Sequence, residues 1–204
     1  MMKYFFSIFV LISVIINPLN VYAEEIVLAG GCFWCLEHDL ESLAGVNNVE
    51  SGYSGGELIN PTYENHNGHQ EVVLVDYLPE QVKLEEILRS YFRNIDPLDG
   101  GGQFCDRGDS YRPVIFFDNK DDEKIASYAL NAASRELSVP LQEIQVELKK
   151  RSQFWIAEDY HQNYADNNEL KYKFYRYACG RDKRLDQLWG KNARSLNSWS
   201  KNGS

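Results

Sequence analysis

The sequence predicts a single α/β domain, a two-layer sandwich of the α/β or α+β class in which helices pack on a mixed β-sheet. Two observations support this prediction. Short apolar runs typical of buried strands alternate with longer segments whose apolar residues recur every three or four positions, in the order β-α-β-β-α-β-α-β. The chain of 204 residues, 44% of them hydrophobic, is also long enough to bury one core of ordinary size.

The first half of the predicted domain contains three strands and two helices. Strands are indicated by apolar runs that end at glycine or proline, and helices by one apolar face. In chain order we expect a strand at Glu25–Ala29, a helix at Cys32–Ala44 closed by Gly45, strands at Val49–Tyr53 and Glu71–Tyr77, and a helix at Gln81–Arg93. Residues 57–68 contain Asn-Pro and Asn-Gly and are predicted to form a loop.

The second half begins with a glycine- and aspartate-rich loop, residues 96–112, of the kind that often carries functional side chains. The elements after it are a strand at Pro113–Asp118, a helix at Asp121–Leu137 with acidic residues in its first turn, and an edge strand at Gln145–Lys149. Beyond Phe154 we expect short helical and irregular pieces, and a frayed polar end over the last dozen residues.

The first 23 residues have the organisation of a secretory signal peptide. A basic start at Lys3 precedes an apolar run from Tyr4 to Ile16, and Ala23 ends a small-residue cleavage site. The apolar run is shorter than the ~20 residues that a membrane-spanning helix needs, so a retained anchor is the less favoured alternative. We expect cleavage after Ala23 and export, to a periplasm, where disulfides are permitted. One folded domain then covers residues 24–190, followed by a polar tail over 191–204.

Composition and charge exclude several classes of function. Thirty acidic against 21 basic residues give a net charge of −9 without a basic cluster, which argues against nucleic acid or an anionic membrane as partner. Four cysteines are too few for a disulfide-framework miniprotein. His66 and His69 have no carboxylate or cysteine at ligand spacing to complete a metal site, and no motif implies a bound cofactor.

Cys32 is the first candidate for chemistry, because it follows Gly30 and Gly31 at a predicted strand-to-helix junction. The dipole and the unpaired N–H groups of a helix N-terminus stabilise a thiolate, so Cys32 is placed as a nucleophile would be. The two glycines would let another molecule approach the backbone closely. Phe33 and Trp34 are compatible with core packing or with an apolar cage for a methyl or thioether group.

Seven ordered blocks of sequence carry a resemblance to a known family. They are GCFW, SGYSGG, NPTY, GHQEVV, NIDP, CDRGDSYRP and AEDYHQ, spread from about Ile26 to Trp189. In this order they resemble the peptide methionine sulfoxide reductases of the A type. The resemblance implies a two-layer sandwich built around a ferredoxin-like core, which agrees with the element order above.

The resemblance also implies a role for each matched residue. Cys32 would be the nucleophile, and the aromatic pair Phe33 and Trp34 would hold the S-methyl group of the substrate. Glu71, in the GHQE block, would donate a proton. Tyr63 and Tyr111 would donate hydrogen bonds toward the sulfoxide oxygen, and Asp106 would belong to the same polar cluster.

The chemistry of sulfoxide reduction accounts for these residue types. The oxygen leaves only if it is protonated while a thiolate attacks the sulfur, which calls for a carboxylic acid kept protonated near neutral pH by an apolar site. Glu71, at the head of a hydrophobic strand, fits this role. The attack releases methionine and leaves Cys32 as a sulfenic acid. A second thiol then condenses with it to a disulfide, which an external dithiol reduces.

The cysteine that closes this disulfide stays open at the level of the sequence. Many members of the family have glycine where this chain has Cys35, and they use cysteines near the C-terminus, where Cys179 lies. Cys32 and Cys35, however, form a Cys-x-x-Cys pair at a helix start, the spacing of local redox disulfides. Cys35 is therefore the first candidate, followed by Cys179 and then by Cys105, which precedes Asp106.

Other residues of the chain have less distinctive interpretations. His161, in the AEDYHQ block, would either support the site from behind or be a hydrogen-bonded surface residue. The tyrosines near the C-terminus are interpreted as packing residues; these are Tyr172, Tyr175 and Tyr177.

Two other functions compete with the reductase. A general thiol–disulfide oxidoreductase using Cys32 and Cys35 would leave Glu71, Tyr63 and Tyr111 without a role. A metal-sensing or structural binding module is disfavoured by the ligand spacing. The leading prediction is an exported, monomeric enzyme without a bound cofactor that reduces methionine S-sulfoxide, in oxidised proteins or free, and is regenerated by a thioredoxin-like dithiol protein.

Overall fold

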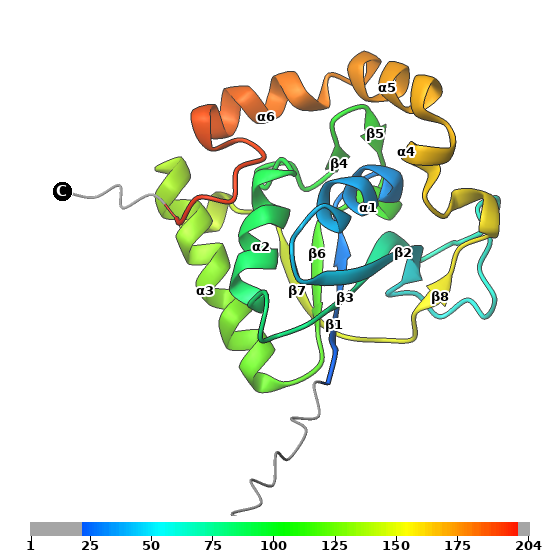
Figure 1. Cartoon of the computed structure of the whole chain (residues 1–204), viewed down its shortest axis with the longest axis horizontal. Coiled ribbons are helices and arrows are strands. Elements are labelled where there is room, and N and C mark those ends of the chain that lie inside the picture. Colours follow the sequence, from blue (N-terminus) through cyan, green and yellow to red (C-terminus); the bar gives the residue numbers. More distant parts are fainter. Residues whose placement is uncertain (1–21, 200–204) are drawn as a thin grey trace, which may run out of the picture.

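The computed structural model describes residues 22–199 of the chain (Figure 1). The expected signal segment, residues 1–23, lies outside the described residues except for its last two, so its role stays a prediction. Within the described part, each helix is too short or too polar to span a bilayer.

A six-stranded mixed sheet with packed helices confirms the predicted fold class. Its strands follow the order β7-β6-β1-β3-β2-β8. Their bounds are β1 Glu24–Ala29, β2 Val46–Ser54, β3 Gln70–Tyr77, β6 Val114–Phe117, β7 Glu147–Lys150 and β8 Trp155–Ile156. Neighbouring strands are antiparallel except β6 and β7, which are parallel.

The centre of this sheet has the ferredoxin-like arrangement that the resemblance implies. Helix α1 (Phe33–Glu41) connects β1 to β2, and α2 (Leu84–Arg93) follows β3 on the way to β6. The order β6-β1-β3-β2, antiparallel throughout, is that of a βαββαβ core. Helix α3 (Lys120–Leu137) then returns the chain to β7, beside β6.

Strand β1 is buried on both faces, which explains its continuous apolar run. Because successive side chains of a strand point to opposite faces, Ile26 and Leu28 join the main core with side chains of α1, α2 and α3. Val27 and Ala29 face the other way, into a smaller apolar cluster that includes Phe116. The C-terminal end of this rigid strand leads directly to Cys32.

The segment predicted as a loop, residues 96–112, contains more structure than expected. It forms a ribbon of two short strands, β4 (Gly102–Gln103) and β5 (Asp106–Arg107), followed by the 3-10 turn η1 (Asp109–Tyr111). The buried Gln103 side chain fixes the segment, since its Oε1 accepts from the Asp96 N–H and its Nε2 donates to the Asp96 carbonyl, both at 2.8 Å. Apolar periodicity gives no sign of such side chain–backbone bonds.

Beyond Phe154 the chain forms the short helical pieces that the sequence predicted, and three of them are α-helices. The elements of the C-terminal third not yet named are η2 (Leu141–Glu143), η3 (Asp159–His161), α4 (Tyr164–Asn167), α5 (Glu169–Ala178), α6 (Arg181–Trp189) and η4 (Gly190–Asn192). In Figure 1, α5 and α6 run above α1 and the β4–β5 ribbon. Arg176 of α5 pairs with Asp39 of α1 at 2.8 Å, and the buried Arg181 of α6 donates to the Asn94 carbonyl at 2.6 Å.

The expectation of a frayed end is wrong for residues 193–199. The buried Arg93 side chain of α2 donates to the carbonyl oxygens of Ser195 at 3.0 Å and Ser198 at 3.2 Å. Its guanidinium also lies 5.3 Å from the ring centre of Trp199. The anchors of this segment are mostly backbone carbonyls, which a polar sequence does not reveal.

Candidate active site

The residues predicted to carry chemistry meet at one small cavity of about 50 Å³. It lies where β1 ends, between α1, β3, the β4–β5 ribbon and α5. The residues that line it are Cys32, Phe33, Trp34, Tyr63, Glu71, Asp106, Tyr111 and Tyr175. The structure therefore brings together the predicted nucleophile, acid, aromatic pair, hydrogen-bond donors and Asp106, and adds Tyr175.

Cys32 and Cys35 are both free thiols at the start of α1. Cys32 is the N-cap residue, one position before the helix, and its side chain is 5% exposed. Cys35 is 1% exposed and in hydrogen-bonding contact with Cys32. A thiol at Cys35 thus lies within reach of any sulfenic acid formed on Cys32.

The protonation of this pair differs from the sequence prediction for Cys32. Burial, followed by the hydrogen bond with Cys35, raises the pKa of the Cys32 thiol, so desolvation outweighs the helix terminus. The hydrogen bond from Cys32, helped by the nearby Arg181 guanidinium, lowers the pKa of Cys35. The more acidic thiol of the pair is therefore Cys35, and its thiolate accepts the hydrogen bond of the Cys32 thiol.

Gly30 and Gly31 serve packing within the protein, so their predicted role in approach by another molecule is wrong. A Cβ atom on Gly30 would lie 2.7 Å from Cγ2 of Ile95, and one on Gly31 would lie 2.6 Å from Cβ of Gln103. Gly31 also has a φ of +83°, a conformation that favours glycine. The two glycines let β1 turn into α1 directly beside the buried Gln103.

Glu71 is the carboxylic acid of the site. It stands near the start of β3, 2% exposed, and its Oε2 accepts a hydrogen bond from the Phe33 backbone N–H at 3.2 Å. Burial is the largest influence and raises its pKa to about 8, although the bond from Phe33 acts in the opposite direction. Glu71 therefore holds its proton at neutral pH, as a general acid requires.

Tyr63, Tyr111 and Asp106 complete the polar side of the cavity. Burial and the charge of Glu71 raise the pKa of Tyr63 to about 12 and that of Tyr111 further, so both hydroxyls stay protonated donors. Tyr111 lines the same cavity as Glu71. Burial raises the pKa of Asp106 as well.

Phe33 and Trp34 form the apolar wall, and His161 holds Trp34 in place. The indole Nε1 of Trp34 donates to Nδ1 of His161 at 3.1 Å, and its ring stacks on Tyr164 with the centres 3.8 Å apart. His161 is buried, and burial lowers its pKa, which favours the neutral ring that can accept this bond. Of its two interpretations, support from behind the site is the one that the structure shows.

Tyr175 is the residue of the cavity that sequence reasoning missed. Its hydroxyl donates to Oδ2 of Asp106 at 2.6 Å, and the residue lines the cavity with Cys32 and packs against the buried cluster that contains Cys32. Its ring meets Trp34 edge to face at 6.0 Å between centres. One signal was available: Tyr175 precedes Cys179 by four residues, so the two share a helix face if the segment is helical.

The remaining two cysteines, Cys105 and Cys179, are bonded to each other. This pairing joins two of the three candidates for the resolving thiol and leaves Cys35 as the free thiol beside Cys32. His66 and His69 are likewise engaged within the structure. The rings of His66 and Tyr53 stack with centres 5.0 Å apart, and both ring nitrogens of His69 bond to the backbone of Gly56 and Leu58.

A larger hollow of about 800 Å³ lies between α5 and α6. Its lining is mostly charged and exposed, with Lys173, Asp182 and Lys183 among the residues. The nine residues that line it include none of the predicted site residues. The small cavity at Cys32 is therefore the candidate active site.

A buried thiol pair, a protonated carboxyl and an apolar wall define a thiol-dependent reductase that protonates the oxygen it removes. Comparison with known proteins gives the family. Residues 24–193 match the sequence model described as "Peptide methionine sulfoxide reductase". The chain belongs to the peptide methionine sulfoxide reductase family, in its A type.

Relatives along most of the chain agree with this assignment. "Peptide methionine sulfoxide reductase MsrA 2" of Caulobacter vibrioides is 46% identical over 171 residues, covering 82% of this chain and 86% of the relative. The protein of the same name in Rhizobium meliloti is 38% identical over 195 residues, covering 95% and 97%. "Peptide methionine sulfoxide reductase MsrA/MsrB" of Vibrio cholerae is 42% identical over 198 residues, 92% of this chain, which spans only 52% of that protein.

Two solved structures show the same fold. Mxr1 from Saccharomyces cerevisiae in reduced form has a TM-score of 0.67 at 27% identity, covering 75% of this chain and 88% of that one. Methionine sulfoxide reductase A of Corynebacterium diphtheriae has a TM-score of 0.64 at 31% identity, covering 72% and 76%. The predicted family, activity class and fold are confirmed by these comparisons.

Proposed function

We propose that the enzyme reduces the S epimer of methionine sulfoxide, in oxidised proteins and as the free amino acid, by attack of Cys32 on the sulfoxide sulfur. The observation that supports this most is the meeting of Cys32 and Glu71 at one small cavity. Phe33 and Trp34 offer an apolar wall to the S-methyl group on one side. The polar hydroxyls of Tyr63 and Tyr111 receive the oxygen on the other.

The first step moves two protons. Cys32 gives its proton to the thiolate of Cys35 as its sulfur attacks the substrate sulfur, and Glu71 donates its proton to the oxygen. The sulfoxide S–O bond breaks, methionine leaves, and Cys32 carries the hydroxyl as a sulfenic acid. The negative charge of the site has then moved from Cys35 to Glu71, which regains a proton from solvent.

The second step closes a disulfide between Cys32 and Cys35. The Cys35 thiol attacks the sulfenic sulfur, an S–S bond forms, and the hydroxyl leaves with the Cys35 proton as water. Contact between the two thiols supports this assignment, as does the mutual bond of Cys105 and Cys179. An external dithiol protein of the thioredoxin kind then returns both cysteines to thiols, and no bound cofactor enters the cycle.

The proposed cellular location of the enzyme rests on the first 23 residues. A signal segment that is cleaved after Ala23 would leave Glu24, the first residue of β1, at the mature N-terminus. We expect a monomer in a periplasm. N-terminal sequencing of protein recovered from a periplasmic fraction would give Glu-Glu-Ile, whereas an intact Met1 in a membrane fraction would show a retained anchor.

The activity is tested with the separated S and R sulfoxides of a blocked methionine. Mature protein from Glu24 onward, with dithiothreitol as reductant, is expected to convert the S form and leave the R form unchanged. One thiol pair should be consumed for each methionine formed. Turnover of the R form at the same rate would contradict the proposed epimer preference, and no turnover of either form by folded protein would contradict the proposed function.

A further inference from the structure

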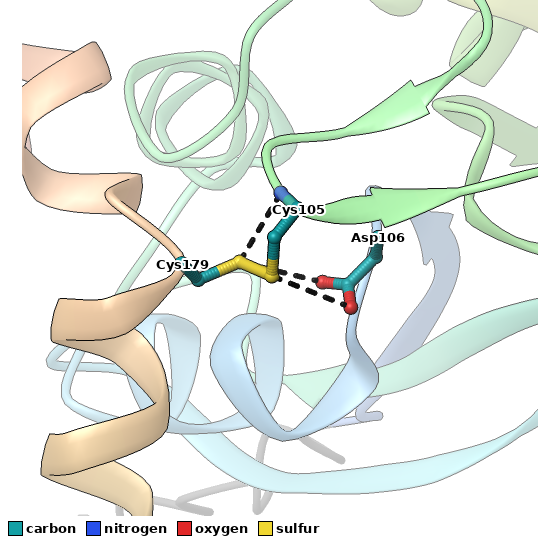
Figure 2. Close-up of side chains that lie close together, drawn as sticks. All are labelled: Cys105, Asp106 and Cys179. Atoms are coloured by element: carbon teal, nitrogen blue, oxygen red, sulfur yellow. Dashed lines mark hydrogen bonds between the residues drawn. A yellow bond between two sulfur atoms is a disulfide. The ribbon is translucent and has the colours of Figure 1, made fainter.

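The disulfide between Cys105 and Cys179 joins two segments that line the active site, the β4–β5 ribbon and helix α5. Cys105 precedes β5, and Cys179 is the C-cap of α5, 74 residues further along the chain. The Cα atoms are 5.0 Å apart. Figure 2 shows the bond running from the end of α5 to the ribbon, with Asp106 directly beside it.

Asp106 lies against this disulfide. Its Oδ1 is 3.8 Å from the Cys105 sulfur and its Oδ2 is 3.9 Å from the Cys179 sulfur (Figure 2). A disulfide sulfur has no hydrogen to donate, so these are packing contacts. The Cys105 backbone N–H points at the Cys179 sulfur at 3.2 Å. The crosslink therefore fixes the backbone immediately before Asp106 as well as one side of its carboxyl group.

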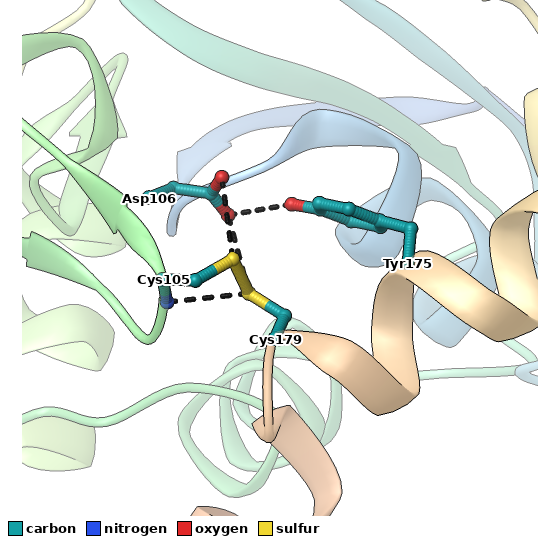
Figure 3. Close-up of a disulfide and its surroundings, with 4 residues drawn as sticks. All are labelled: Cys105, Asp106, Tyr175 and Cys179. Carbon is teal, nitrogen blue, oxygen red and sulfur yellow. Dashed lines mark hydrogen bonds between the residues drawn. A yellow bond between two sulfur atoms is a disulfide. The ribbon is translucent and has the colours of Figure 1, made fainter.

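Tyr175 is held in place through Cys179, the other cysteine of the same crosslink. It lies one helical turn before Cys179 on α5, and its hydroxyl points back to Asp106 Oδ2 at 2.6 Å (Figure 3). Tyr175 also packs against the buried cluster that contains Cys32, and there its hydroxyl acts to lower the pKa of the thiol, against the larger effect of burial. A tyrosine has one hydroxyl hydrogen, so Asp106 and Cys32 share one donor.

This arrangement gives the crosslink a place in the reaction. The Tyr175 hydroxyl can rotate about its C–O bond, so its hydrogen can turn from Asp106 toward the Cys32 sulfur as that sulfur gives up its proton. The geometry depends on α5 and the ribbon keeping their separation. Within the described residues, the disulfide is the covalent link between these two segments beside the site.

We propose that the Cys105–Cys179 disulfide is a permanent crosslink that positions Tyr175, through Asp106, against Cys32, and that it takes no part in recycling. Tyr175 is then a further catalytic residue, since it lines the cavity beside the reacting sulfur, and the disulfide is a positioning element. This inference rests on the proposed function, in which Cys35 alone resolves Cys32. It accounts for the different states of the two cysteine pairs, since Cys105 and Cys179 form a disulfide while Cys32 and Cys35 are free thiols.

The test compares wild type, Tyr175→Phe, Cys105→Ser/Cys179→Ser and the combined triple variant. Two quantities are measured at 25 °C: the rate of the first methionine formed in a single turnover, and the pH dependence of alkylation of Cys32 by iodoacetamide, followed by peptide mass spectrometry. Tyr177→Phe is the matched control, because Tyr177 lies on the same helix but is 85% exposed. Circular dichroism confirms that each variant is folded.

We expect Tyr175→Phe and the double serine variant each to lower the single-turnover rate about tenfold or more and to shift Cys32 alkylation to higher pH. The triple variant should be no slower than Tyr175→Phe alone, because both changes remove the same contact. Tyr177→Phe should match wild type. Additive losses in the triple variant would contradict the proposal, because the disulfide would then act elsewhere than on Tyr175.

A stoichiometry experiment tests the second half of the proposal. Fully reduced wild-type enzyme, with its four thiols and no added reductant, should form one methionine per chain, at the lower rate expected when the crosslink is open. Two methionines per chain would show that Cys105 and Cys179 recycle the catalytic pair, and would overturn the proposal while leaving the proposed function intact. If wild type forms no methionine, the proposed function fails, but the shared shift in Cys32 alkylation would still support the positioning by the disulfide.

Discussion

The backbone N–H of Phe33 donates a hydrogen bond of 3.2 Å to Oε2 of Glu71, so the first residue of α1 holds the acid one position from the nucleophile. A bond to a carboxylate oxygen favours the ionised form, yet the pKa of Glu71 is about 8 because burial dominates. The bond therefore orients the acid while the apolar surroundings keep it protonated. Orientation and acidity at this site have separate physical causes.

The rate of the methionine-forming step should depend on pH through Glu71. The protonated acid is the active form, so kcat/KM in wild type should fall as pH rises through about 8. Glu71→Gln should lower the rate by about 10²-fold or more, the usual range for loss of a general acid, and should remove this alkaline limb. The measurement is a pH profile of single-turnover rates for both proteins. An alkaline limb unchanged in Glu71→Gln would assign it to another group.

The same carboxyl should make the folded protein less stable at alkaline pH. Its folded pKa of about 8 lies above an ordinary glutamate pKa, so the folded state holds more protons between these values and stability declines as pH rises from about 4 through 8. Glu71→Gln should therefore be more stable than wild type at pH 9, by about 5 kcal/mol, and similar at pH 4. Urea unfolding at both pH values measures this, with the exposed Glu80→Gln as control. A variant less stable than wild type at pH 9 would refute the assignment.

Loss of the hydrogen-bond acceptor at His161 should weaken substrate binding more than it slows the chemical step. His161→Ala removes the hydrogen-bond partner of the Trp34 indole and leaves that ring held only by packing, as against Tyr164 and Tyr175, so the apolar wall is less well positioned. We expect KM to rise about tenfold with a smaller change in kcat, partial recovery in His161→Gln, which retains an acceptor, and no change in His38→Ala, a partly exposed histidine of α1. An unchanged KM in His161→Ala would show that Trp34 needs no such support.

Removing the crosslink should cost stability as well as positioning. A disulfide that closes a loop of 74 residues stabilises mainly by restricting the unfolded chain, and such bonds contribute about 3 kcal/mol. Cys105→Ser/Cys179→Ser should thus lose about 3 kcal/mol in the free energy of unfolding by urea and remain folded at 25 °C. A loss below about 0.5 kcal/mol would indicate that α5 and the ribbon stay together without it.

Much of the site was predictable because the family's motifs place chemistry-bearing residues next to distinctive glycines, prolines and aromatics. Seven of the eight residues around the cavity, from Cys32 to Tyr111, were identified in this way. Tyr175 was missed because a tyrosine in an aromatic helical segment has the same pattern whether it packs in a core or lines a site. Its partner Asp106 comes from a segment 69 residues away in sequence, which no local pattern reveals.

The protonation states and the cysteine pairing could not be predicted for a related reason. Four cysteines allow three connectivities when all are paired, and spacing favours the local pair Cys32 and Cys35 over the distant pair that the structure closes. The helix terminus at Cys32 suggested a lowered thiol pKa, whereas its burial, which depends on the C-terminal helices, raises it. These quantities depend on tertiary packing beyond the motif.

In the proposed cycle Cys32 takes the oxygen of the sulfoxide, and Cys35 then displaces that oxygen as water by forming a disulfide with Cys32. The most direct measurement is to treat Cys35→Ser with one equivalent of the S-sulfoxide and dimedone, without reductant, and to map the modified peptides by mass spectrometry. We expect one methionine per chain and one dimedone adduct, on Cys32, while wild type treated in the same way shows a Cys32–Cys35 disulfide and little adduct. Methionine formed without an adduct on Cys32, or a disulfide from Cys32 to Cys105 or Cys179 in wild type, would contradict the account.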